Sequence, residues 1–219
     1  MSEKRDIATR MAGNQKQASI SEFFEKNKHF LGFDSLHRSL ITAVKEAVDN
    51  ALDACEEARI LPDIKIDIRK ADPKRDIIEL EVEDNGPGIP RDSIAKVFGQ
   101  LLFGSRFHAI RQSRGQQGIG ITGVVMYSQL TTGKPTHVRS KIASETTAVE
   151  MDLGLDTKSN KAIKSKEQRV PWVLEDGTEK VSGLNVRCRM KAKFQRGKQS
   201  VWQYLRMTSI VNPHASITF

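Results

Sequence analysis

The chain has 219 residues, of which 38% are hydrophobic and 28% charged, and it carries a formal net charge of +8. This balance is typical of a globular protein rather than a disordered tail, and the positive charge suits a polyanionic partner without requiring one. Two cysteines provide no disulfide framework and no zinc spacing, and no apolar run approaches the ~18 residues of a membrane span or forms a secretory leader.

The N-terminal part predicts an arm followed by two helices. Residues 1–18 are polar and aperiodic, so we expect an extended arm there. Ser19 begins a capping box for a short helix over "SISEFFEKNK". After the break "GFDS", a long helix is expected to reach about Arg59, with Asp34 or Ser35 as its N-cap.

The middle of the chain predicts a hairpin, a glycine–proline loop and two helices around a longer loop. "DIKIDIR" and "DIIELEVE" alternate apolar and polar residues as half-buried strands do, and "KADPKRD" is a turn between them. The loop "DNGPGIP" precedes "RDSIAKVFGQLLF", which is helical in part. "GSRFHAIRQSRGQQGIGITG" is expected to be a long loop, and "ITGVVMYSQL" a helix that begins at its end.

The C-terminal part predicts three strands and a closing helix. The strands are "PTHVRSKI", "TTAVEMDLG" and "SGLNVRCRMKAKF", and "KSNKAIKSKEQR" between them is expected to be an exposed polar excursion. "QSVWQYLRMTSIV" is a helix that Asn212 and Pro213 end, and the final "ASITF" resembles the start of a strand, as in a piece of a larger protein. These elements predict an α/β two-layer sandwich, a mixed sheet with helices on one face.

Several familiar site motifs fail on spacing. "TTGKPT" has no glycine five residues before Gly133, which excludes a Walker phosphate loop. Gly115, Gly118 and Gly120 run in the reverse order of the dinucleotide fingerprint, and "DNGPGIPRD" has glycines where a calcium loop needs oxygen ligands. The five histidines show no ligand spacing, so we expect no metal site built from them.

The long helix carries an acidic stripe formed by Glu46, Asp49, Asn50 and Asp53, with no cation among them. The opposite side of this helix is apolar and is expected to face the core. The stripe is either a solvated acidic face or a site for a cation and a polar ligand.

Two glycine-containing segments favour the second interpretation. Asp84 ends a strand and precedes Gly86 and Gly88; this is either a plain turn or a carboxylate that accepts from an exocyclic amine beside a flat ring. "RGQQGIG" offers free backbone N–H groups just before a helix, an arrangement suited to phosphate. Glu46 and Asn50, one turn apart, suit the orientation of a water molecule and the binding of magnesium.

These segments, in this order, resemble the N, G1 and G2 boxes of the GHKL ATPases, the superfamily of DNA gyrase, MutL, the large heat-shock chaperone and the histidine kinases. The matching residues are Glu46-x-x-x-Asn50, Asp84-x-Gly86-x-Gly88 and Gly115-x-x-Gly118-x-Gly120. Further stretches, among them "VFGQLLFGSRFH", "RQSRGQQGIGI" and "MTSIVNPHA", resemble the B-subunit family of DNA topoisomerase VI. This resemblance covers roughly residues 10 to 219.

The resemblance implies a Bergerat-type fold that uses ATP and Mg²⁺, with a role for each matching residue. Glu46 would activate the hydrolytic water, Asn50 would bind magnesium, and Asp84 would accept from the adenine amino group. Ser105 and Arg106 would contact phosphates from a lid; the family usually has lysine at position 106, so the phosphate contact would differ here. The segment that wraps the phosphates would consist of Gly115, Gln116, Gln117, Gly118, Ile119, Gly120, Ile121 and Thr122.

The resemblance also implies a nucleotide-gated clamp in the cytoplasm, associated with the nucleoid. It would partner a topoisomerase VI A subunit in the passage of duplex DNA and would dimerise with a second B protomer when ATP binds. The arm 1–18 would act as a strap and residues 19–219 as the ATPase domain. The helical and transducer domains of the family, with a lysine that reaches the γ-phosphate, would be missing. The alternatives are another GHKL ATPase, such as a mismatch-repair clamp, and a non-hydrolysing nucleotide- or DNA-binding module.

The segment "LNVRCRMKAKF" predicts a strand with two different faces. Leu184, Val186, Cys188, Met190 and Phe194 would face the core, and the other face would present Arg187, Arg189, Lys191 and Lys193. This cationic face is either a solvated edge strand that resists aggregation or a surface that faces DNA.

Overall fold

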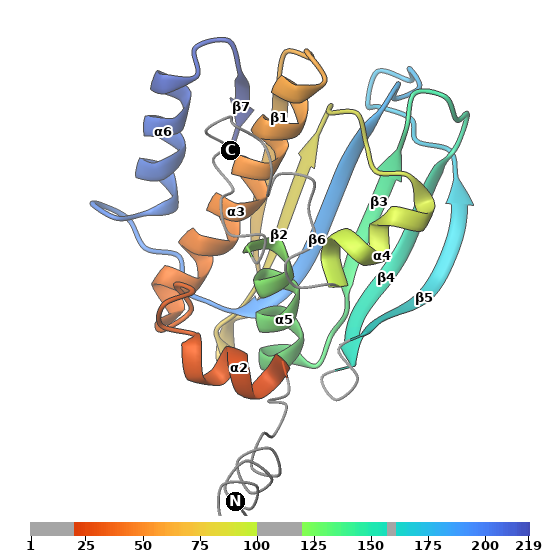
Figure 1. Cartoon of the computed structure of the whole chain (residues 1–219). Coiled ribbons are helices and arrows are strands. Elements are labelled where there is room, and N and C mark those ends of the chain that lie inside the picture. The colour runs from red at the N-terminus through yellow and green to blue at the C-terminus, as the bar shows by residue number, and fades with distance from the viewer. Residues whose placement is uncertain (1–19, 100–119, 157–160) are drawn as a thin grey trace, which may run out of the picture.

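A seven-stranded mixed sheet carries helices on one of its faces (Figure 1). The computed structural model describes residues 20–99, 120–156 and 161–219. The strand order is β5-β4-β3-β6-β2-β1-β7, and neighbouring strands are antiparallel except for β1 and β7, which are parallel. The strands are β1 (Asp63–Asp72), β2 (Ile77–Asp84), β3 (Thr136–Lys141), β4 (Ala148–Asp156), β5 (Lys161–Val170), β6 (Gly183–Lys191) and β7 (Ser216–Thr218). The predicted two-layer α/β sandwich is therefore confirmed.

The helices begin and end close to the predicted positions. They are α2 (Ile20–Asn27), α3 (Leu36–Glu57), α4 (Arg91–Gly99), α5 (Gly120–Thr132) and α6 (Val201–Val211), with a short 3-10 turn, η1 (Pro73–Arg75), between β1 and β2. Ser35 caps α3 by accepting a hydrogen bond from the Arg38 backbone N–H. Ser200 caps α6 in the same way, and α6 ends at Asn212, as the Asn-Pro pair predicts.

The core lies between the sheet and the helices α3 and α5. The apolar side of α3 is buried, as predicted, and α5 is buried on most sides because it packs against β6, β4, α3 and α4. The Tyr127 hydroxyl donates to the Lys191 carbonyl at 2.8 Å, and the Ser128 hydroxyl donates to the Arg189 carbonyl at 2.8 Å. These bonds fix α5 on β6. Within the described ranges, none of the helices has the length and apolarity needed to cross a membrane.

The prediction of an excursion over "KSNKAIKSKEQR" is wrong, because most of this segment forms the edge strand β5. Residues 161–170 pair antiparallel with β4 and are exposed along most of their length. An edge strand that buries neither face has no apolar alternation, so the period-two signal was absent. The charged side chains suit an edge that must not pair with another chain.

Candidate functional site

The catalytic candidate Glu46 and the magnesium-binding candidate Asn50 lie half-buried on α3. They lie beside the fully buried Val44 and Val48, whose packing fixes the helix against the core. Burial raises the pKa of the Glu46 carboxyl above its usual value; the charge of Lys45 opposes this and the charge of Asp49 adds to it. Glu46 is therefore more basic than a solvated glutamate.

Helix α5 begins with a glycine that touches the Glu46 carboxylate. A Cβ atom placed on Gly120 would overlap Oε2 and Cδ of Glu46. Glycine thus allows the first turn of α5 to approach the carboxylate directly. Of the rest of the predicted phosphate segment, Ile121 packs partly buried against the core and Thr122 is buried. The structure therefore places Gly120, the last glycine of the predicted phosphate segment, in contact with Glu46 of the acidic stripe.

Asp84 ends β2 as a buried carboxylate with 5% of its surface exposed. Its Oδ1 accepts hydrogen bonds from the backbone N–H groups of Gly86, at 2.8 Å, and Leu184, at 3.2 Å. Burial raises the pKa of the carboxyl to about 6, although both N–H donors and the charge of Lys180 act in the opposite direction. Neither bond uses Oδ2, the oxygen that suits an external donor.

The loop after Asp84 is held close to β3 and to the end of α3. A Cβ on Gly86 would lie 3.3 Å from the Cys55 sulfur. Gly88 has a φ of +73°, and a Cβ there would overlap the Lys141 carbonyl. Ser140 fixes the next residue, because its hydroxyl accepts from the Ile89 N–H at 2.7 Å and donates to the Ile89 carbonyl at 2.9 Å. Gly88 thus lies where the backbone of β3 approaches closely, and Gly86 lies where side chains of α3 do.

The acidic stripe of α3 differs from the prediction in one respect. Asp49 is buried, with 6% of its surface exposed, and Asp53 is buried as well, so they do not form an open acidic face. The Lys45 ammonium donates to Asp49 Oδ2 at 2.8 Å, and the Tyr204 hydroxyl of α6 donates to Asp49 Oδ1 at 2.8 Å. The chain therefore supplies a cation for Asp49 itself, and Glu46 and Asn50 remain the members of the stripe that suit an external ligand.

Several predicted site residues lie outside the described residues. They are the lid residues Ser105 and Arg106 and the phosphate-segment residues Gly115, Gln116, Gln117, Gly118 and Ile119; the arm 1–18 lies outside as well. In the part of the chain that the structure describes, no group of three or more His, Cys, Asp or Glu side chains is arranged to hold a metal ion.

The cationic residues of β6 lie in the middle of the sheet, not at its edge, which excludes the edge-strand interpretation. Arg187, Arg189 and Lys191 are exposed on the face of the sheet opposite the described helices, and Lys193 follows the strand. Arg189 pairs with Glu79 at 2.7 Å and Lys193 with Asp76 at 3.3 Å. Val186, Cys188 and Met190 are buried as predicted, Leu184 is half-buried, and Phe194 is 39% exposed, so its assignment to the core is wrong.

A cavity of about 610 Å³ lies on the face of β2 opposite to the Asp84 side chain. The neighbours Glu83 and Asn85 line it, and Asp84 does not, because alternate residues of a strand point to opposite faces. Its other lining residues are Ile60, Asp63, Lys65, Leu174, Thr178, Glu179, Lys180, Val181 and Ser182. This cavity is therefore separate from the Asp84 carboxylate and from the contact between Glu46 and Gly120.

Known proteins share both the sequence and the fold. Residues 36–157 match the family described as histidine kinase-, DNA gyrase B- and HSP90-like ATPase. The B subunit of type 2 DNA topoisomerase 6 from Archaeoglobus fulgidus is 55% identical over 95% of this chain and 33% of its own length. The corresponding protein of Methanosarcina barkeri is 51% identical over 97% of this chain and 33% of its own length. The chain thus spans about a third of the length of these relatives.

A solved structure supports the fold independently. The ATPase region of Saccharomyces cerevisiae topoisomerase II, bound to ICRF-187 (dexrazoxane), matches 82% of this chain and 47% of its own with a TM-score of 0.56. The identity is 13%, so this likeness shows the fold alone. Because the family model matches more than half of the chain, the chain belongs to the histidine kinase-, DNA gyrase B- and HSP90-like ATPases, as an ATP-binding ATPase region of the topoisomerase 6 B-subunit type.

Proposed function

We propose that Glu46, Asn50 and Asp84 form the working centre of this ATPase region, and that the region drives a type II DNA topoisomerase. The observation that carries the first part is the contact between the Glu46 carboxylate and Gly120 at the start of α5. A base on one helix thereby lies against the helix start that is predicted to bind the phosphates.

Asp84 would select adenine through its free oxygen. With Oδ1 occupied by two backbone donors, Oδ2 accepts a hydrogen bond from an exocyclic amino group. Gly86 leaves room beside the carboxylate for the flat ring. A base without that amino group loses this bond and is rejected.

Asn50 suits a magnesium ion that travels with the nucleotide. Its side chain offers one amide oxygen and is half exposed. Mg²⁺ is often held by one or two protein oxygens, with phosphate and water as the other ligands. When bound, the ion would neutralise phosphate charge, and the backbone of residues 115–122 would hold the phosphate oxygens.

Glu46 would act as the general base for hydrolysis. The water oxygen forms a bond to the γ-phosphorus, its proton passes to Glu46, and the bond from the γ-phosphorus to the bridging oxygen of ADP breaks. The raised pKa of Glu46 brings its basicity closer to neutral pH, where a base is most effective.

The relatives support a role in DNA topology. They are B subunits of a type 2 DNA topoisomerase, and this chain matches about a third of their length. We infer an A-subunit partner, a duplex DNA substrate and a nucleotide-dependent dimer of B protomers, in which arm 1–18 reaches the second protomer. The working location would be the nucleoid in the cytoplasm.

A binding titration tests the proposed centre. A non-hydrolysable ATP analogue should bind more tightly with Mg²⁺ than without it, and Asn50→Ala should remove most of this difference. Glu46→Ala should bind the analogue about as well as the parent and should lose turnover, because a base acts on the transition state. Turnover that survives in Glu46→Ala would overturn its role as base.

A further inference from the structure

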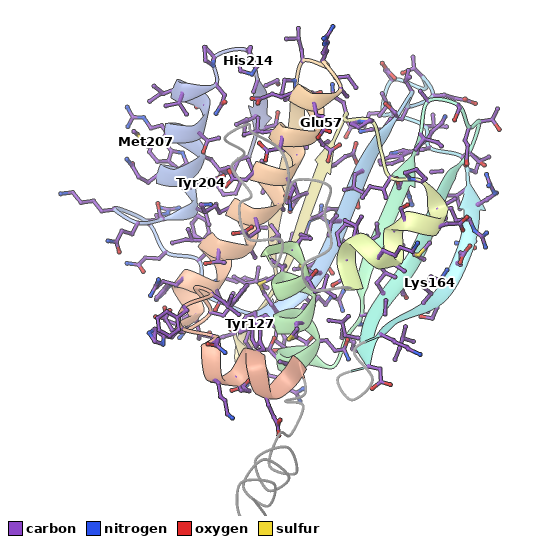
Figure 2. All side chains as sticks on the ribbon, in the orientation of Figure 1. Glu57, Tyr127, Lys164, Tyr204, Met207 and His214 are labelled. Carbon is purple, nitrogen blue, oxygen red and sulfur yellow. The ribbon has the colours of Figure 1, made fainter. Side chains whose placement is uncertain are left out.

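Helix α6 reaches the catalytic helix through a hydrogen-bonded chain of three residues. The Tyr204 hydroxyl donates to Asp49 Oδ1 at 2.8 Å, and the Lys45 ammonium donates to Asp49 Oδ2 at 2.8 Å. Figure 2 shows Tyr204 on the side of α6 that faces α3, with Met207 on the outer side. Burial and the charge of Asp49 raise the pKa of the Tyr204 hydroxyl, so this group remains a donor at all working pH values. Asp49 is therefore held on both oxygens.

This chain of residues lies directly beside the proposed base. Lys45 precedes Glu46 in the sequence, and Asp49 follows it by three residues, on the next turn of the helix. The charges of Lys45 and Asp49 act on Glu46 in opposite directions. Among the described residues that pack near Glu46, Gly120 adds no charge, and Tyr204 of α6 adds a hydroxyl that stays neutral.

We propose that Asp49, fixed by Tyr204, is a positioning residue that pins the Lys45 ammonium and cancels its charge at Glu46. The proposal rests on the role of Glu46 as general base. Without Asp49, an uncompensated cation would lie next to Glu46 and would favour its ionised form. The carboxylate would then accept the proton of the attacking water less readily, and hydrolysis would slow.

The expected effect falls on the chemical step and not on binding. One unit charge at about one helical turn, in a medium of effective dielectric near 40, changes the rate roughly 10-fold. Adenine recognition by Asp84 and phosphate binding by backbone N–H groups do not use Lys45 or Asp49. Asp49→Asn should therefore lower kcat roughly 10-fold while KM for Mg·ATP changes by less than about 2-fold.

Further variants distinguish this electrostatic role of Asp49 from a purely structural role in holding α3 in place. In Lys45→Gln/Asp49→Asn both opposing charges are gone, so kcat should return to near the value of the parent. Tyr204→Phe leaves Asp49 charged but less firmly held, so its kcat should fall by less than that of Asp49→Asn. Glu25→Gln is the matched control: it removes the acid of the exposed pair between Glu25 of α2 and Lys28 just after it, at 3.0 Å, and should leave kcat unchanged.

Single-turnover hydrolysis by the 219-residue chain measures all these variants, and thermal unfolding confirms that each is folded. A double variant as slow as Asp49→Asn overturns the proposal, because the loss would then come from packing or from the neighbouring Asn50. If Asp49→Asn does not fold, Tyr204→Phe decides: a kcat equal to that of the parent overturns the proposal. Turnover retained in Glu46→Ala would instead refute the proposed function, so the two failures are distinguishable.

Discussion

Asp84, the proposed acceptor for adenine, also destabilises the empty protein. The folded pKa of Asp84, about 6, lies above its ordinary value of 3.8. Below about pH 4 the Asp84 carboxyl is protonated in the folded and unfolded chain, and its burial costs no charge. As the pH rises through about 6, the buried carboxyl ionises and the folded state loses stability relative to the unfolded state. At neutral pH the chain thus retains a buried charge that lowers the free energy of unfolding. Such a cost in stability is typical of residues that are kept for function.

Asp84→Asn is therefore expected to stabilise the empty chain and to weaken nucleotide binding. The amide keeps an oxygen for the Gly86 and Leu184 N–H groups and removes the buried charge. Urea unfolding at about pH 7 should show a gain of roughly 1–3 kcal/mol, which shrinks toward zero near pH 4. Affinity for ATP should fall by roughly 1.5–3 kcal/mol. A variant less stable than the parent at neutral pH, or one that binds ATP equally well, contradicts this account.

Gly120→Ala tests the contact between the two helices. Alanine suits the backbone at Gly120 and favours the helix by about 1 kcal/mol, but its Cβ would displace the Glu46 carboxylate. A displacement of about 1 Å at a catalytic group lowers the rate up to about 100-fold, so turnover should fall while stability is kept. Gly123→Ala is the matched control in α5, because its Cβ would lie 3.5 Å from Phe33, an ordinary contact. Equal turnover in both variants would remove Gly120 from the site.

At the scale of the element, the helices and strands that could be predicted from the sequence are those with a local signal, such as apolar periodicity or a cap. The long helix α3 has apolar periodicity and a serine cap, and α6 has a serine cap and an Asn-Pro stop. The buried strands β2, β4 and β6 have apolar positions that mark them. Strand β5 could not be predicted, because it is exposed on nearly every residue and only its pairing with β4 makes it a strand.

The same limit applies to the candidate site. Each motif could be recognised in the sequence as a loop or a helix stripe, but the residues that contact it from distant parts of the chain could not. The N–H of Leu184 reaches Asp84 from a strand 100 residues away, and Tyr204 reaches Asp49 from 155 residues away. The pair formed by Lys45 and Asp49 did have a local signal, since the residues are four apart on one helix.

Because β6 lies in the middle of the sheet, neighbouring strands supply acidic partners to some of its cations, and fewer of them remain available to bind DNA phosphates. Arg189 and Lys193 already pair with Glu79 and Asp76, and among the described residues no ion pair engages Arg187 or Lys191. Arg187→Gln/Lys191→Gln should thus lower the salt slope of DNA binding by about 2 units if both meet phosphates. Arg189→Gln/Lys193→Gln is the matched control and should lower it by less. Equal slopes in the parent and both variants would exclude β6 as a DNA-facing surface.

At the scale of the whole molecule, the open question is how much of the catalytic cycle residues 1–219 perform. The described residues contain the proposed adenine acceptor on the sheet, and the proposed base and the start of α5 in the helix layer that packs on it (Figure 1). The chain spans about a third of its relatives' length, and the resemblance implies a lysine from a later domain on the γ-phosphate. Such a cation acts mainly when charge builds on the transferring group.

A polypeptide of residues 1–219 is therefore expected to bind Mg·ATP well and to hydrolyse it slowly. Loss of one preorganised charge lowers the rate roughly 10²–10³-fold, whereas Mg²⁺ and backbone N–H groups still hold the phosphates in the ground state. Single-turnover hydrolysis measures the rate, and sedimentation with a non-hydrolysable analogue should detect a weak dimer that disappears without nucleotide. Rapid steady-state turnover would mean that the cation lies within these residues. Arg106→Ala would then be the first variant to test, because Arg106 stands where the family usually carries lysine.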